Sequence, residues 1–90
     1  MNAYVYRADL HCAPCGERIM TYLGIDSGDS DDYPQGPYPN GGGEADTPQH
    51  CGTCGVFLEN PLTDDGVEYV REASDGPVVE LWREFYASVL

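Results

Sequence analysis

The chain carries one six-residue frame twice, as His11-Cys12-Ala13-Pro14-Cys15-Gly16 and as His50-Cys51-Gly52-Thr53-Cys54-Gly55. These two stretches contain all four cysteines of the protein. In a Cys-x-x-Cys-Gly turn the main-chain amides point toward the first thiolate, and the glycine avoids a steric clash. Two such turns place four sulfurs around one ion, which is the closed shell that structural zinc prefers. The spacing therefore predicts one metal site whose ligands are Cys12, Cys15, Cys51 and Cys54.

The size and composition of the chain agree with a fold that needs such a site. Its 90 residues predict a single small domain, residues 1–90. The hydrophobic share of 41% includes seven tyrosines, whose hydroxyl groups prefer water, and residues 25–49 contain almost no aliphatic side chain. A hydrophobic core this small usually requires additional stabilisation, for example from a bound metal. The sequence shows no signal-peptide pattern, which indicates a cytoplasmic chain whose reduced thiols favour metal over disulfides.

The charge of the chain narrows the classes of partner. Sixteen acidic residues stand against four arginines and no lysine, so the formal net charge is −12. Such a field repels phosphate backbones and anionic membranes, and it argues against direct nucleic-acid binding. No apolar stretch reaches the length of a membrane span. Two interpretations of the acidic surface stay open: a solvated, salt-adapted exterior, or a face offered to a basic protein.

The segments around the first cysteine pair predict one strand, one helix and a long loop. Residues 3–10 are rich in aromatic and β-branched side chains and form the predicted strand. Residues 17–23 form a predicted helix that ends at Gly24, with an apolar inner face made by Ile19, Met20 and Leu23. Residues 25–49 repeat Pro and Gly, which disfavour both helix and sheet, and are predicted to form a long flexible loop.

The second cysteine pair leads into a helical C-terminal part, residues 63–90. Residues 56–58 predict a short strand that closes a hairpin around the metal. A helix follows over about 63–74, with acidic residues in its first turn, where the helix dipole favours them. The sequence Asp75-Gly76-Pro77 separates it from a last helix over about 77–89. That helix carries an apolar stripe, interpreted as core or as a surface for a dimer or partner: Val78, Leu81, Trp82, Phe85 and Val89.

Three other patterns accompany the cysteine pairs. His11 and His50 each precede a pair, and either could replace a cysteine, hydrogen-bond a metal sulfur, or simply be a polar residue at the edge of the turn. Glu44, Asp46 and His50 offer a second cation site or only an acidic loop. The segment Cys12-Ala13-Pro14-Cys15 also has the Cys-x-Pro-Cys form of thioredoxin-like oxidoreductases, but that interpretation leaves the second pair without a role.

Through Cys12-x-x-Cys15-Gly16 and Cys51-x-x-Cys54-Gly55 the chain resembles zinc-ribbon and rubredoxin-like proteins. The resemblance implies a metal that is most often structural zinc, or iron that carries single electrons in the rubredoxins. The long segment between the pairs and the two C-terminal helices depart from the rubredoxin pattern. A wider string within residues 33–62 is similar to a group of small uncharacterised bacterial and phage proteins, and this similarity implies no function.

Together these patterns predict an α+β fold: a small zinc ribbon with short antiparallel strands, a long acidic Pro/Gly-rich loop and two C-terminal helices. The leading functional hypothesis is a non-enzymatic module with a structural zinc site made by the four cysteines and a protein partner, as a monomer or as a dimer through the last helix. No Ser–His–acid arrangement or phosphate-binding loop indicates an enzyme. Two alternatives are a rubredoxin-like iron electron carrier and an acidic, nucleic-acid-mimicking inhibitor of a DNA- or RNA-binding protein.

Overall fold

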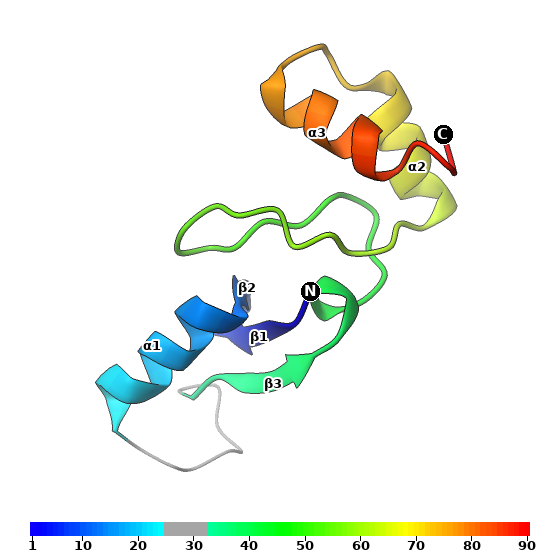
Figure 1. Ribbon diagram of the computed structural model, residues 1–90. Helices are drawn as coiled ribbons and strands as arrows, with labels where there is room; N and C mark the ends of the chain where they lie inside the picture. Colours follow the sequence, from blue (N-terminus) through cyan, green and yellow to red (C-terminus); the bar gives the residue numbers. More distant parts are fainter. Residues whose placement is uncertain (25–32) are drawn as a thin grey trace.

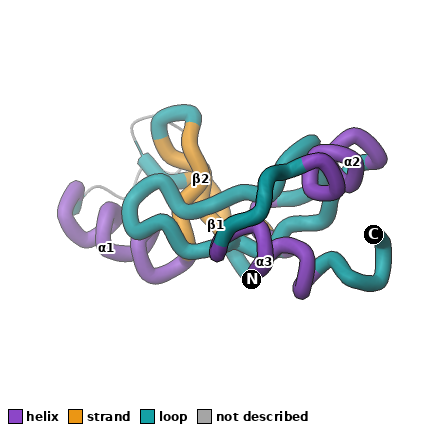
Figure 2. Tube along the Cα trace, turned by 90° about the horizontal axis from the view of Figure 1, so that it is seen from above, coloured by secondary structure: helices purple, strands orange, loops and turns teal. Residues whose placement is uncertain are grey.

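The computed structural model describes residues 1–24 and 33–90 of the chain. It shows a small α+β fold, with the sheet and α1 at one end, α2 and α3 at the other, and loops from the second half of the chain between them (Figure 1). The molecule is elongated, 42 Å by 22 Å by 17 Å, and α1 and α2 also lie at opposite ends in Figure 2. In order, the elements are β1 (Ala3–Tyr6), β2 (Asp9–Cys12), α1 (Ala13–Leu23), β3 (Gln35–Tyr38), the 3-10 turn η1 (Asn40–Gly42), α2 (Asp64–Glu72) and α3 (Pro77–Phe85).

The predicted α+β class, with short antiparallel strands and two C-terminal helices, is confirmed. The described strands form one antiparallel sheet in the order β2-β1-β3. None of the helices in the described residues is long and apolar enough to cross a membrane.

The first cysteine lies on a hairpin, where the sequence predicted a single strand over residues 3–10. β1 and β2 are joined by Arg7-Ala8, and both residues have positive φ values, 51° and 60°. Such φ values are typical of two-residue hairpin turns, whose twist matches that of the antiparallel strands they join. Glycine or asparagine usually occupies these turn positions. Neither is present here, so the turn has no compositional signal. Its consequence is that Ala3 pairs with Cys12 and anchors the start of the metal site in the sheet.

The segment predicted to be a long loop contains β3 and η1. β3 pairs with the free edge of β1, so the prediction that Pro and Gly exclude a sheet here is wrong. Pro37, which follows a cis peptide bond, is tolerated because β3 is an edge strand. Gly41 has φ 63°, and a Cβ atom there would collide with the carbonyl group of Leu58. Residues 25–32 of the predicted loop lie outside the described residues.

Helix α1 starts earlier than predicted, at Ala13, because Pro14 is well suited to a first helical turn. It ends as predicted at Gly24, whose φ of 63° is the left-handed conformation of a helix C-cap. The buried residues of the helix are Cys15 and Gly16, while the predicted inner face is half-buried. A Cβ atom on Gly16 would overlap the ring of Tyr4, so this glycine lets the helix lie directly on β1.

Two small hydrophobic clusters make up the core of the described residues. One surrounds the cysteines and adds only Ala3 and Leu58 as fully buried apolar residues. The other lies among the C-terminal helices and contains Phe57, Val70 and Tyr86. Phe57 and Leu58 are consecutive on an extended segment, so their side chains point to opposite sides and each serves a different cluster. This pair connects the metal region to the helical region.

The C-terminal helices begin at the predicted signals. The hydroxyl group of Thr63 accepts a hydrogen bond from the amide of Gly66 (3.1 Å), which caps α2, and α3 begins at Pro77. α3 ends at Phe85, about one turn before the predicted end. The prediction that its apolar stripe is core is wrong, because four of its five members are between 45% and 52% exposed: Val78, Leu81, Phe85 and Val89. Burial instead falls on Tyr86, in the turn after the helix.

Candidate metal centre

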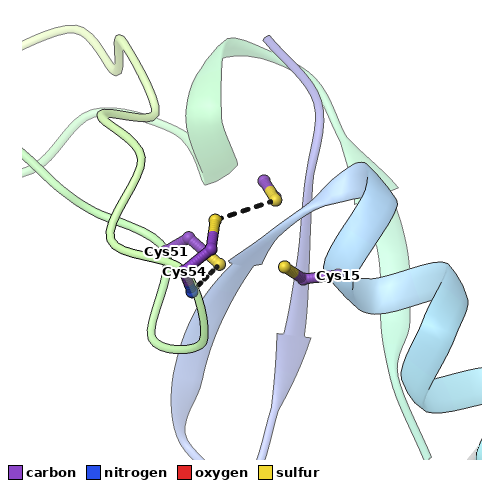
Figure 3. A group of neighbouring side chains, drawn as sticks. Cys15, Cys51 and Cys54 are labelled. Atoms are coloured by element: carbon purple, nitrogen blue, oxygen red, sulfur yellow. Dashed lines mark hydrogen bonds between the residues drawn. The ribbon is translucent and has the colours of Figure 1, made fainter.

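The structure brings the four cysteines together between the end of β2, the first turn of α1 and the second Cys-x-x-Cys turn. Their Sγ atoms all lie within 4.8 Å of one another, and Cys12 Sγ is 3.7 Å from Cys54 Sγ. Figure 3 shows Cys51 and Cys54 facing Cys15 across the site. A tetrahedral zinc with Zn–S bonds of about 2.3 Å holds its sulfurs roughly 3.8 Å apart. The cluster therefore fits a four-sulfur metal site with a small contraction, and none of the four cysteines forms a disulfide, whose sulfurs would lie about 2 Å apart.

The second turn is positioned by main-chain hydrogen bonds to β2 and within itself. The amide of Gly52 donates to the carbonyl oxygen of Leu10 (2.8 Å), which docks the turn against the first cysteine strand. The amide of Cys51 donates to Val56 (2.9 Å), and His50 forms an isolated bridge with Phe57. The hairpin predicted around the metal is thus present as a single bridge, without a regular strand over residues 56–58. Gly55 allows the tight return of the chain with φ 81°.

The two cysteine pairs have different electrostatic surroundings. Burial raises the pKa of Cys15 to about 12, and the neighbouring cysteine sulfurs act in the same direction. Burial also raises the pKa of Cys12. At Cys51 burial opposes ionisation, but main-chain hydrogen bonds outweigh it and lower the pKa to about 5; the amides of Thr53 and Cys54 each donate to its sulfur at 3.4 Å. A cation would meet a ready thiolate at Cys51, and Cys12 and Cys15 would lose protons on binding.

Both histidines lie outside the sulfur cluster and support it through hydrogen bonds. His11 is buried, and its Nδ1 lies 2.9 Å from the hydroxyl group of Thr53, so it joins the first pair to the second turn. His50 Nδ1–H donates to the carbonyl oxygen of Gly55 (2.8 Å), while His50 Nε2 accepts the indole N–H of Trp82 (2.9 Å). This tautomer follows because a carbonyl only accepts and an indole only donates. His50 therefore connects the metal turn to α3.

Sequence reasoning missed Asn60, which it did not identify as a candidate site residue. Its side chain is fully buried and fully satisfied: Oδ1 accepts the amide of Gln49 (2.8 Å), and Nδ2 donates to the carbonyl oxygens of Thr47 (3.2 Å) and Pro61 (3.1 Å). The hydroxyl group of Tyr86 also donates to the main-chain oxygen of Asn60. This network holds the segment that enters the second turn. No local pattern predicts it, because all of its partners except Pro61 are distant in sequence.

The structure does not assemble the second cation site that Glu44, Asp46 and His50 offered. Asp46 accepts a hydrogen bond from Thr63 (2.5 Å), and both ring nitrogens of His50 are engaged elsewhere. Within residues 1–24 and 33–90, the four cysteines form the one cluster of metal-binding side chains.

Comparisons with known proteins identify no relative of this chain. No protein-family model matches the chain, and searches of the curated proteins and of the solved structures return no match. The resemblance to zinc-ribbon and rubredoxin-like proteins therefore rests on the cysteine cluster, which is compatible with a zinc site. The similarity to bacterial and phage proteins gains no support.

Proposed function

We propose that this chain is a non-enzymatic protein-interaction module whose four cysteines hold a structural zinc ion. The observation that supports it most is the closed sulfur set, since four thiolates fill the tetrahedral shell and leave no position for a substrate. The contacts around the set point the same way. His11 ties the two cysteine turns together, and His50 ties the second turn to α3, so a bound metal would fasten the sheet to the helices.

A structural role for the metal is also supported by how little else fills this part of the core. Among the described residues, Ala3 and Leu58 are the only other fully buried side chains of that cluster, and Leu10 packs against it partly buried. Two such side chains contribute a few kcal/mol of hydrophobic stabilisation at most, while a structural zinc contributes on the order of 10 kcal/mol to folding. The metal would then supply much of the stability of the N-terminal half.

An interaction role is supported by the surface that remains. The chain has a net charge of −12, and α3 keeps large apolar side chains about half exposed. Isolated exposed apolar residues are common, but several on one helix face are typical of binding surfaces.

Elemental analysis and metal removal test the structural part of this proposal. We expect colourless protein with one zinc per chain, and loss of its folded circular-dichroism spectrum after chelation. Red protein that bleaches on reduction would support the iron electron carrier instead, and an unchanged spectrum after chelation would contradict a structural metal. The interaction part predicts that zinc-loaded protein captures a specific protein from cell extract and that the Cys15→Ser variant does not. Equal capture by both would contradict the link between metal and binding.

A further inference from the structure

We propose that the groove between α2, the end of α3 and the segment 59–64 binds a basic amphipathic helix of a protein partner. This inference rests on the proposed interaction function and specifies its site and the chemistry of the partner. The groove has a volume of about 830 Å³. A site of this size accommodates side chains of a docked helix.

The lining of the groove has an apolar part, which we call the floor, and an acidic part, which we call the rim, and the floor is partly held in place. It is lined by Leu62, Val67, Phe85 and Val89, of which Phe85 is 45% exposed and Val89 is 52% exposed. The Phe85 ring packs edge-on against Phe57 (5.4 Å between centroids) and Tyr86 (5.0 Å). Its position is therefore fixed before a partner arrives, which lowers the entropic cost of binding.

The exposed face of α3 extends this floor. Val78, Leu81 and Phe85 lie three and four residues apart on α3, Val89 follows in the turn after the helix, and each is about half exposed. From Val78 to Phe85 the face is roughly 10 Å long at 1.5 Å per residue. Together with the groove it offers anchor positions at the spacing that helix-in-groove complexes use.

The rim of the groove is acidic. Glu59, Asp64 and Glu68 line it, and no ion pair in the described part of the chain includes any of them. The one cationic side chain in the lining is Arg71, whose guanidinium group donates twice to the main-chain oxygen of Leu90 (3.0 and 3.3 Å). An apolar floor with unpaired carboxylates at its edge matches an apolar helix face flanked by lysine or arginine.

The position of Glu59 supports this assignment. Its φ of 56° is left-handed, a conformation that costs a residue with a side chain roughly 1 kcal/mol. Two effects raise the pKa of Tyr86 to about 12: burial is the larger, and the negative charge of Glu59 is the second. Because Tyr86 also lines the groove, the charge of Glu59 is felt inside the groove. The backbone thus holds a carboxylate at the groove although glycine would fit there with less strain.

Charge decides between a basic partner and a second copy of this chain. Two copies would each carry −12 and would bring the same acidic rim to the contact, so their long-range interaction is repulsive. A basic helix gains from the same field. Nucleic acid is disfavoured as an occupant because its phosphates are also negatively charged.

The test uses the zinc-loaded full chain and a synthetic amphipathic peptide of leucine and lysine, about 14 residues long or roughly 20 Å as a helix. A peptide of the same composition without an apolar face is the control. Binding is measured by fluorescence anisotropy in about 0.15 M salt, where diffuse charge attraction is largely screened. We expect the amphipathic peptide to bind saturably and to shift amide NMR signals of α2 and α3.

Matched variants separate the groove from overall charge. Glu59→Gln with Glu68→Gln removes two rim carboxylates, and Glu17→Gln with Glu44→Gln removes two acids that do not line the groove. We expect the first pair to weaken binding about fivefold, as two exposed ionic contacts would, and the second pair to have little effect. Val89→Ser should also weaken binding, while Val56→Ser, on an exposed residue outside the groove, should not.

If the two double Glu→Gln variants weaken binding equally, or if the control peptide binds as well as the amphipathic peptide, the groove is not the binding site. Only diffuse charge attraction would then explain the binding. Saturable binding that shifts signals on another face would overturn the groove but leave the interaction module standing. Lack of saturable binding would also overturn the groove, while the proposed function is decided separately by zinc content, chelation and zinc-dependent capture.

Discussion

The hydrogen bond between Trp82 and His50 predicts how strongly α3 is attached to the metal turn. The Trp82→Phe variant keeps an aromatic ring between His50 and Tyr69, which lie 5.9 and 6.1 Å from the indole between ring centroids, but removes the N–H donor. A neutral hydrogen bond contributes about 1 kcal/mol net. His50 is half-buried, so water can replace the lost donor and the full penalty for an unsatisfied buried group does not apply. We therefore expect a loss of about 1 kcal/mol, which for a chain of this length lowers Tm by about 4–8 °C.

The assay is thermal unfolding of zinc-loaded protein followed by circular dichroism, with zinc release recorded by a colorimetric chelator in the same samples. Leu81→Ala on the same helix is the control, because Leu81 is 47% exposed and belongs to neither buried cluster. If the bond couples α3 to the metal turn, Trp82→Phe should also speed zinc release, and Leu81→Ala should not. A Tm within about 1 °C of the parent chain, or zinc release unchanged by Trp82→Phe, would refute the reasoning.

Three other perturbations test the described contacts. Asn60→Ala should destabilise the protein by about 3 kcal/mol in urea unfolding, because it removes three hydrogen bonds of a fully buried side chain, each of which contributes about 1 kcal/mol; a loss below about 1 kcal/mol would contradict the network. Gly41→Ala should lower Tm more than Gly24→Ala, because both have a φ of 63° but only the Cβ atom on Gly41 would meet the Leu58 carbonyl group; equal effects would contradict this packing. Zinc binding at pH 7 should release at least two protons, because the raised pKa values keep Cys12 and Cys15 protonated without metal. Apparent affinity should then fall by at least about 100-fold for each unit by which pH is lowered near neutrality. Titration against a competing chelator at two pH values measures this dependence, and a smaller fall would contradict the raised pKa values.

The features predicted correctly from the sequence are those that depend on local chemistry. Gly24 ends α1 because glycine adopts the left-handed conformation readily, and Asp75-Gly76-Pro77 separates the last two helices. The cysteines come together as the spacing of the two pairs suggested. Each of these signals lies within a few residues of the structure it specifies.

The features that were missed depend on contacts between distant segments. β3 forms because β1 offers a free edge, and the turn at Arg7-Ala8 exists because two strands pair across it, although neither residue favours such a turn. The periodicity of the last helix correctly indicated an apolar stripe, but periodicity does not show whether anything covers a stripe. Burial depends on neighbours that no local window contains.

The exposed stripe follows from the way the two hydrophobic clusters share one extended segment. Leu58 packs among the cysteines and Phe57 packs among the helices. The side chains that contact Phe57 therefore determine which side of α3 faces the rest of the molecule. The rings of Phe85 and Tyr86 pack on Phe57, and Trp82 packs against the same cluster. Trp82 also bonds His50, and Tyr86 bonds the main chain of Asn60. Satisfying these two polar tips sets the rotation of α3, because an indole N–H or phenol buried without a partner is costly. The aliphatic members of the stripe are thereby turned outward, and the apolar face beside the acidic groove is a consequence of how the helix is fastened to the cysteine turn.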